Sequence, residues 1–455
     1  MKKDIHVQVK DNSPSIERIL RPISYTSWLL GVGVAHPRKC PKIITIIIRI
    51  IHIFLCSVSV TYDAIYFFPY VQKLDIFDSI YCLSKVMCYV STYYYIYHGI
   101  GQYNKWPELM DRLEELDQKI RKEISMNDRS IKIVETLAIF ATFISCPLIL
   151  IIHVLYRHLQ TVPIYDNDIP DFMFYYLLSQ SLIYSFVFDV IVYVLYCRFQ
   201  AINKLIGQLD KSSDLSWVAF KIRGIRKLYS GICDFASMVN DIHGSYLLLC
   251  SANCFIMAVA ALFQSYIFVI ERDYEFILIQ NFFCIAYVTQ FYLICWICTL
   301  VRQESNRTGR IIYEIMLNYK PANLDNQETR NQSSLEMRPS LENLDGERDF
   351  NRSSSHHLNC NIKENSLSGN LDQECVAKEI NDFSIQLQQN QIVFTACDFF
   401  EINNALFRSF VAVIISYLVI VGQLYQQPED LSTLKKLILK MTKKNQTVVP
   451  AGAAR

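Results

Sequence analysis

The chain has 455 residues, of which 52% are apolar and 19% are charged, and its formal net charge at pH 7 is only +1. This charge balance argues against a general nucleic-acid-binding protein, and the mean hydropathy of +0.18 is high for a soluble protein with this content of charge. The composition therefore predicts a protein whose main partner is the lipid bilayer.

Most of the 15 cysteines lie inside apolar stretches of the sequence, where a secreted disulfide framework is not expected. They are interpreted as buried small apolar side chains, and this includes the redox-like spacing of Cys295 and Cys298. We find no glycine-rich phosphate loop, nucleophile elbow or metal-binding helix, so no catalytic residue, metal site or cofactor is predicted and the chain is not expected to be an enzyme.

Seven apolar stretches follow a polar segment at residues 1–42, and each is long enough to cross a hydrocarbon layer of about 30 Å as a helix. The sequence therefore predicts an all-α membrane protein with seven transmembrane helices. The predicted spans are residues 43–68, 76–97, 134–156, 172–196, 245–270, 276–300 and 405–425.

The segments between these spans differ in character. Residues 99–132 and 197–244 are charged and have helical periodicity, and residues 301–319 are predicted to form a helix that leaves the membrane. Residues 320–374 are rich in Asn, Ser, Glu and Gln, which predicts a disordered insertion, and order is expected to resume near Val376. An atypical basic tail occupies residues 426–455.

The distribution of Lys and Arg predicts the orientation of the chain. The amino-terminal segment holds eight such residues and the loops after spans two, four and six hold seven, seven and ten, whereas each alternate loop holds one. Under the positive-inside rule, the amino terminus is cytoplasmic and the carboxy terminus is extracellular. This topology is the reverse of that of a G-protein-coupled receptor.

The carboxy-terminal stretch carries a recognisable motif. Ser416-Tyr417 is followed by five residues, Leu418 to Gly422, and then by Gln423-Leu424. This pattern resembles the carboxy-terminal signature of insect gustatory receptors, in which Thr-Tyr precedes five mostly apolar residues and Gln-Phe. The preceding Phe394-Thr-Ala-Cys-Asp-Phe-Phe also looks like that family's approach to its seventh helix.

The resemblance implies a tetrameric ligand-gated cation channel of the plasma membrane of gustatory receptor neurons, with the insect chemoreceptor channel fold. Residues 43–300 would form a six-helix ligand-binding membrane domain, residues 376–404 a cytoplasmic anchor helix and residues 405–425 the pore-lining helix. The subunits could be identical or different gustatory receptors. The implied pore and gate residues are Val413, Ser416, Tyr417, Ile420, Gln423 and Leu424.

A ligand pocket is expected in the outward halves of spans four to six, where amides and phenols stand on apolar helices. Such a wall suits a small neutral polar tastant such as a sugar or a bitter compound. Each side chain could instead make an interhelical hydrogen bond or an aromatic packing contact. The candidate ligand-binding residues are Tyr176, Gln180, Tyr184, Gln264, Tyr266, Gln280, Asn281 and Tyr287.

Two charges, Lys85 and Asp189, fall inside predicted spans, where an isolated charge is expensive. One hypothesis is that they form a structural ion pair; the alternative is that each faces a hydrated cavity.

Three further functions compete with a taste-receptor channel. The chain could be an odorant-receptor-type channel subunit, which shares the topology, or a G-protein-coupled receptor, which the charge pattern disfavours. A membrane-embedded enzyme or transporter would need clustered intramembrane His, Asp or Glu residues, and only isolated ones occur.

Overall fold

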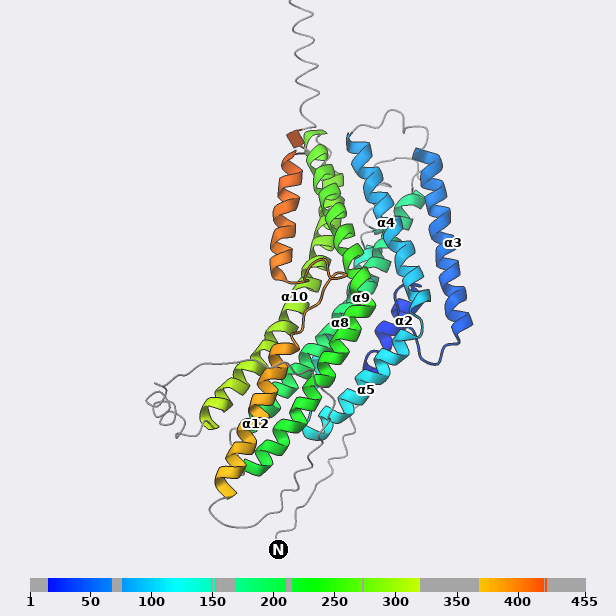
Figure 1. Cartoon of the computed structure of the whole chain (residues 1–455). Coiled ribbons are helices and arrows are strands. Elements are labelled where there is room, and N and C mark those ends of the chain that lie inside the picture. The colour runs from blue at the N-terminus through cyan, green and yellow to red at the C-terminus, as the bar shows by residue number, and fades with distance from the viewer. Residues whose placement is uncertain are drawn as a thin grey trace, which may run out of the picture. The chain divides into compact units, whose positions relative to one another are not determined.

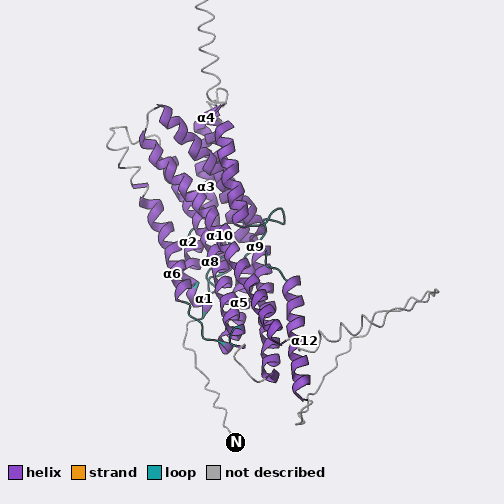
Figure 2. Cartoon of the chain, turned by 90° about the vertical axis from the view of Figure 1, so that its left-hand side faces the viewer, coloured by secondary structure: helices purple, strands orange, loops and turns teal. Residues whose placement is uncertain are grey.

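The computed structural model of the protein describes residues 15–67, 76–148, 150–151, 155, 168–209, 215–271, 274–319, 368–420 and 422–423. Within these residues the regular structure is helical, and the one β-interaction is an isolated bridge between Thr395 and Glu401 (Figure 2). The prediction of an all-α protein is therefore confirmed for the described part of the chain. The predicted gate residue Leu424 and the tail at 426–455 lie outside it.

The described helices include five that are long and apolar enough to cross a membrane. They contain α3 (Lys42–Phe67), α6 (Arg129–Phe140) with the π-helical turn η2 (Ala141–Ser145), α8 (Asp168–Ile206), α9 (Leu215–Glu271) and α10 (Tyr274–Tyr319). Two more helices match predicted spans: α4 (Ile76–Gly101) and a shorter apolar helix, Asn404–Ile420, which we call the terminal helix.

The chain folds into two compact units. The first unit comprises residues 1–201, 231–305 and 392–455, and the second comprises residues 202–230 and 306–391. Three long helices, α8, α9 and α10, contribute residues to both units.

The spans of the first unit differ sharply in burial. In the most apolar window of α8, 78% of the residues are buried, whereas only 22% are buried in that of α3. The helix α3 runs beside α4, to which Ser57 and Tyr93 connect it by a 2.7 Å hydrogen bond, and exposes Ile43, Ile47 and Phe54 (Figure 1). An exposed apolar face of this kind suits contact with lipid, and α8 forms the centre of the packing.

The helices α9 and α10 are much longer than a membrane requires. α9 has 57 residues, so at about 1.5 Å per residue it is far longer than a hydrocarbon layer of about 30 Å. Residues 215–244, predicted as a polar segment before span five, are thus continuous with that span. Likewise, the helix predicted at 301–319 is the direct continuation of span six in α10.

The proline in the third span is preceded by a change of helix type. The π-helical turn η2 covers Ala141–Ser145 and ends two residues before Pro147. Proline has no backbone N–H and clashes with the preceding turn, so a regular α-helix cannot run through this point undisturbed. The helix of the third span is therefore irregular just before Pro147, where it forms a π-bulge.

The second unit contains α12 (Ser368–Gln389), which packs against the first residues of α9. Arg223 Nε donates to Glu379 Oε1 at 2.8 Å, Arg226 Nη1 donates to Asp382 Oδ2 at 3.0 Å, and the rings of Tyr229 and Phe383 meet edge to face. Two predicted boundaries are wrong here. Helix α12 begins inside the stretch predicted to be disordered, 320–374, and it ends at Gln389 instead of continuing to residue 404.

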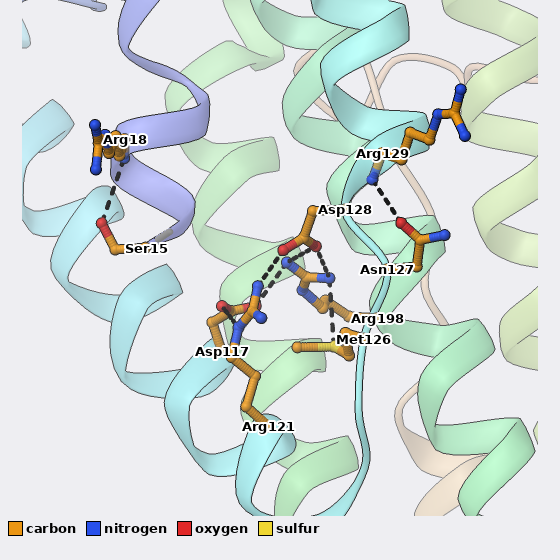
Figure 3. A network of polar contacts seen from close by, with 9 residues as sticks. All are labelled: Ser15, Arg18, Asp117, Arg121, Met126, Asn127, Asp128, Arg129 and Arg198. Carbon is orange, nitrogen blue, oxygen red and sulfur yellow. Dashed lines mark hydrogen bonds and ion pairs between the residues drawn. The ribbon is translucent and has the colours of Figure 1, made fainter. Parts of the chain in front are cut away.

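A buried ionic cluster ties α5 (Lys105–Glu123) to α6 and α8. Arg198 of α8 places Nη2 2.6 Å from Asp117 Oδ1 and Nη1 3.2 Å from Asp128 Oδ1, and Arg121 pairs with the same two carboxylates (Figure 3). Burial disfavours the charge of Arg121, but the hydrogen bonds and charges of Asp117 and Asp128 outweigh it and raise the pKa of Arg121. The apolar side of α5, with Leu109, is buried as its periodicity predicts.

Candidate functional site

The centre of the first unit is polar as well as aromatic. Tyr184 of α8 packs against Tyr246 of α9 with ring centroids 4.1 Å apart, and Tyr95 of α4 packs against both. Tyr287 of α10 is fully buried and lies near Tyr95. We call these four tyrosines, together with Gln180 and Gln290, the polar core.

Hydrogen bonds hold part of the polar core in place. The Tyr184 hydroxyl bonds His98 Nδ1 at 2.7 Å, and Gln180 Nε2 donates to the Leu30 carbonyl at 2.8 Å and to the Tyr176 hydroxyl at 3.0 Å. Tyr176 in turn bonds His52 Nδ1. The predicted ligand residues Tyr176, Gln180 and Tyr184 therefore anchor α8 to elements that precede it in the chain.

Two amide oxygens of the polar core accept no hydrogen bond from the described residues. Gln290 Nε2 donates to Ser181 Oγ at 3.2 Å, but Gln290 Oε1 and Gln180 Oε1 are buried with no hydrogen-bond partner in the described residues. Buried polar atoms are nearly always satisfied by protein, water or ligand. Each oxygen can accept a hydrogen bond from a hydroxyl or amine, which is the chemistry that a small polar ligand offers.

The remaining predicted ligand residues lie away from this cluster. Gln264 is buried and Gln280 and Asn281 are half-buried, and no hydrogen bond or ring contact among the described residues connects these three side chains to the polar core. Tyr266 lies beside the end of the terminal helix, since a Cβ added to Gly422 would lie 4.0 Å from Tyr266 Cζ.

Tyr95, Tyr246 and Gln290 belong to the polar core although they were not predicted as site residues. Tyr95 belongs to a run of tyrosines that reads as an interfacial aromatic belt, yet its exposure is 0%, while Tyr97 two positions later is 70% exposed. The helical spacing of Tyr95 and of His98, one turn apart, is the signal that could have separated the buried face of α4 from its lipid-facing side.

The predicted ion pair between Lys85 and Asp189 is wrong. Lys85 Nζ lies 3.4 Å from Asp63 Oδ2 on α3, and the Tyr89 hydroxyl donates to the same oxygen at 2.6 Å. Both carboxylate oxygens of Asp189 are buried without a hydrogen-bond partner in the described residues, and Cys295 and Cys298 lie near enough to interact with Asp189 electrostatically.

The terminal helix packs through a narrow strip. Phe410 and Ile414 are buried, and the Phe410 ring lies 4.4 Å from that of Phe291. The predicted pore residues that the structure describes lie mainly outside this strip and are exposed: Val413, Ser416, Tyr417, Ile420 and Gln423. Tyr417 also meets Phe255 of α9 edge to face, and Ser416 Oγ donates to the Ala412 carbonyl at 3.0 Å.

A tight hairpin precedes the terminal helix. Its turn residues, Cys397 and Asp398, have φ values of 50° and 60°, and Ile402 N donates to the Phe394 carbonyl at 2.8 Å. The Asn240 side chain of α9 bonds both Thr395 N and Thr395 Oγ1, at 2.8 and 3.2 Å. The start of the terminal helix is thus attached to α9 by side-chain hydrogen bonds, and non-glycine residues hold a conformation that is usually strained.

The described residues contain no group of three or more His, Cys, Asp or Glu side chains that could hold a metal ion.

Comparison with known proteins agrees with this architecture. The structure of the insect olfactory receptor OR5 from Machilis hrabei in complex with eugenol matches with a TM-score of 0.53 at 11% identity, covering 90% of this chain and 97% of that chain. A second structure of the insect olfactory receptor OR5 from Machilis hrabei matches with a TM-score of 0.53 at 10% identity, covering 90% of this chain and 98% of that chain. At this identity the similarity concerns the fold, which is the one predicted.

No curated protein matches the sequence significantly. The model of the family described as 7tm Chemosensory receptor matches residues 20–337 and 367–427, which is most of the chain. This match shows that the chain belongs to the 7tm Chemosensory receptor family. Together with its apolar helices and its similarity in fold to an insect olfactory receptor, the match identifies the chain as a multi-pass membrane protein of the insect chemoreceptor type.

Proposed function

We propose that this protein is a gustatory receptor that acts as a ligand-gated, non-selective cation channel opened by a small tastant. In the proposed assembly, four subunits, identical or mixed with other gustatory receptors, surround one pore in the plasma membrane of gustatory receptor neurons. The amino terminus is cytoplasmic and the carboxy terminus extracellular, as the distribution of Lys and Arg favours. The proposal includes no catalytic step and no cofactor.

The observation that carries the proposal is the one-sided packing of the terminal helix. Its strip at Phe410 and Ile414 packs against the rest of the first unit, while Val413, Tyr417 and Ile420 are 43%, 49% and 51% exposed. An exposed stripe that combines Ser416 and Gln423 with apolar residues suits contact with other subunits and a water-filled path better than lipid alone. Rings of apolar side chains can close a pore, and an amide ring can replace part of an ion's hydration shell.

The polar core is the proposed tastant site. It contains two buried amide oxygens, of Gln180 and Gln290, that have no hydrogen-bond partner in the described residues, together with the packed rings of Tyr184 and Tyr246. Such a wall favours a small ligand with hydroxyl groups and an apolar body, because each hydroxyl can donate to an amide oxygen while the rings cover the apolar atoms.

Whole-cell current in a heterologous cell tests the proposal, with sugars, amino acids and bitter compounds applied while G-protein signalling is blocked. Gln423→Ala is expected to change ion selectivity, and Gln290→Ala to raise the tastant concentration needed for half-maximal current about tenfold or more. Ile415→Ala is the matched control, since Ile415 is exposed on a different face of the same helix. A response that the G-protein block abolishes would overturn the channel assignment.

An odorant-receptor-type channel subunit is the second candidate, because the fold match is to an olfactory receptor. It predicts current in response to volatile apolar compounds and none in response to sugars or bitter compounds.

A further inference from the structure

Two arginines of the first unit are equally buried but differ in their surroundings. Arg198 and Arg49 are each 1% exposed. Arg198 meets two carboxylates, at 2.6 and 3.2 Å (Figure 3). Arg49, near the start of α3, forms one hydrogen bond, from Nη2 to the Gly33 carbonyl at 2.8 Å, and its Nη1 is buried with no hydrogen-bond partner in the described residues.

The described groups near Arg49 supply no negative charge. Its electrostatic partners are the histidines His36 and His98, from the segment before α3 and from α4, and the phenols Tyr103 and Tyr184, from the end of α4 and from α8. The described residues place no Asp or Glu within ion-pair distance of the guanidinium, although they do so for Arg38, Arg121 and Arg198.

The guanidinium of Arg49 also packs closely against the backbone of α4. A Cβ added to Gly99 of α4 would lie 2.6 Å from Arg49 Cζ, 2.7 Å from Nη1 and 2.1 Å from the Gly33 carbonyl oxygen. The guanidinium therefore lies directly against the Gly99 backbone, which brings α3, α4 and the loop at Gly33 together. Gly33 N also donates to the Tyr95 carbonyl at 3.1 Å, so the same loop is attached to the polar core.

A buried guanidinium with a single carbonyl partner is energetically unfavourable. One neutral acceptor returns only part of the lost hydration, and a buried charge left without a counter-charge destabilises a protein strongly. Within a membrane-spanning helix the cost is greater still, because no bulk water reaches the group. A small anion would supply both the missing charge and an acceptor for Nη1.

We propose that Arg49 binds a small monovalent anion, a halide or a small carboxylate, that joins α3 to α4 and to the Gly33 loop. Two groups beside Arg49, the His36 and Tyr103 rings, stack with their centroids 4.1 Å apart, and such close packing favours a small ion. One guanidinium charge balances one monovalent anion. The site is structural and does not depend on the channel assignment.

Thermal unfolding of the purified full chain in sodium chloride, sodium formate and sodium gluconate at equal ionic strength tests the proposal. Gluconate, a much larger anion than chloride or formate, is the reference salt. Chloride, formate or both are expected to raise the melting temperature of the wild type by about 2–4 °C relative to gluconate. Comparison of the chloride and formate measurements shows whether the site prefers a halide or a carboxylate. Arg49→Gln is expected to lose this difference and to melt in gluconate at or above the wild-type temperature, because the uncompensated charge is gone.

Arg198→Gln is the matched control, since it removes an equally buried arginine whose carboxylates are inside the protein. It is expected to melt lower in every salt and to keep the anion-dependent difference. Binding of radioactive chloride to the wild type, at one ion per chain, gives a readout that does not require any variant to fold. A wild type with the same melting temperature in all three salts and no bound chloride or formate would overturn the proposal, as would an anion effect that Arg49→Gln retains.

Discussion

Lys85 of α4 and Asp63 of α3 form an ion pair whose side chains are only 8% and 10% exposed, with Lys85 Nζ 3.4 Å from Asp63 Oδ2. The Tyr89 hydroxyl donates to the same carboxylate oxygen, and Lys85 also lies 5.4 Å from the centre of the Phe174 ring. The pair connects two neighbouring spans in a region where neither charge could be tolerated alone.

Removal of one partner of this pair should therefore be costly. Asp63→Asn leaves a buried ammonium without its counter-charge and is expected to destabilise the protein by about 3 kcal/mol. The double variant Asp63→Asn/Lys85→Met should recover much of that loss, since no isolated charge remains. Surface expression and thermal unfolding measure both effects, and Asp189→Asn serves as the comparison because no cation among the described residues pairs with Asp189. If the loss of stability in the double variant equalled the sum of the losses in the two single variants, the ion pair would be contradicted.

The cluster around Arg198 should be similarly sensitive. Asp128→Ala removes one of its two carboxylates and a partner of Arg121, and we expect a loss of about 3 kcal/mol. Asp111→Ala is the matched control, because Asp111 pairs with Arg38 at 2.7 Å but its side chain is 72% exposed, and an exposed pair contributes less than about 1 kcal/mol. Thermal unfolding of the two variants should differ clearly, and similar losses would refute this ranking.

His36 should give the protein a stability that depends on pH. Burial lowers the pKa of His36, the bond to the Val34 carbonyl opposes this effect, and the charge of Arg49 adds to the lowering. The unfolded chain then binds the proton of His36 more readily than the folded chain does. The contribution of neutral His36 to the free energy of unfolding is therefore fully present above the unfolded pKa of about 6.5, and it is lost as the pH decreases below that value. His36→Gln is expected to reduce this acid sensitivity in unfolding measured between neutral and mildly acid pH. An unchanged pH profile would show that His36 is not responsible.

Two glycines should respond oppositely to alanine. A Cβ at Gly99 would lie 2.1 Å from the Gly33 carbonyl oxygen, so Gly99→Ala must push α4 away from the Gly33 loop, and a loss of about 2 kcal/mol or more is expected. Around Gly309 of α10 nothing lies within 4 Å of the added Cβ, and Gly309→Ala should stabilise the helix by about 0.5–1 kcal/mol. Thermal unfolding of both variants checks the contrast, and a neutral Gly99→Ala would count against the close approach at Arg49.

Local properties of the sequence were enough to predict the helices. The apolar stretches of α3, α8 and α10 are recognisable because each residue's preference for lipid or for a helix can be summed along the chain, and the motif around Tyr417 indicated the family for the same reason. Boundaries that depend on packing were less accurate. Helix α12 starts within the predicted disordered insertion because contacts such as Arg223 with Glu379 stabilise residues of low intrinsic hydrophobicity.

Only the tertiary structure decided which side chains meet. A helical turn advances just 3.6 residues, so the register between two helices determines whether Lys85 faces Asp63 or Asp189, and no local pattern contains that register. The same holds for Tyr95. Its run of neighbouring tyrosines suggests a position at the membrane surface, but in the folded protein Tyr95 is buried in the polar core. The sequence by itself therefore determined the membrane class, most of the spans and the family. The ion pairs, the polar core and the isolated charge of Arg49 followed only from how the helices pack.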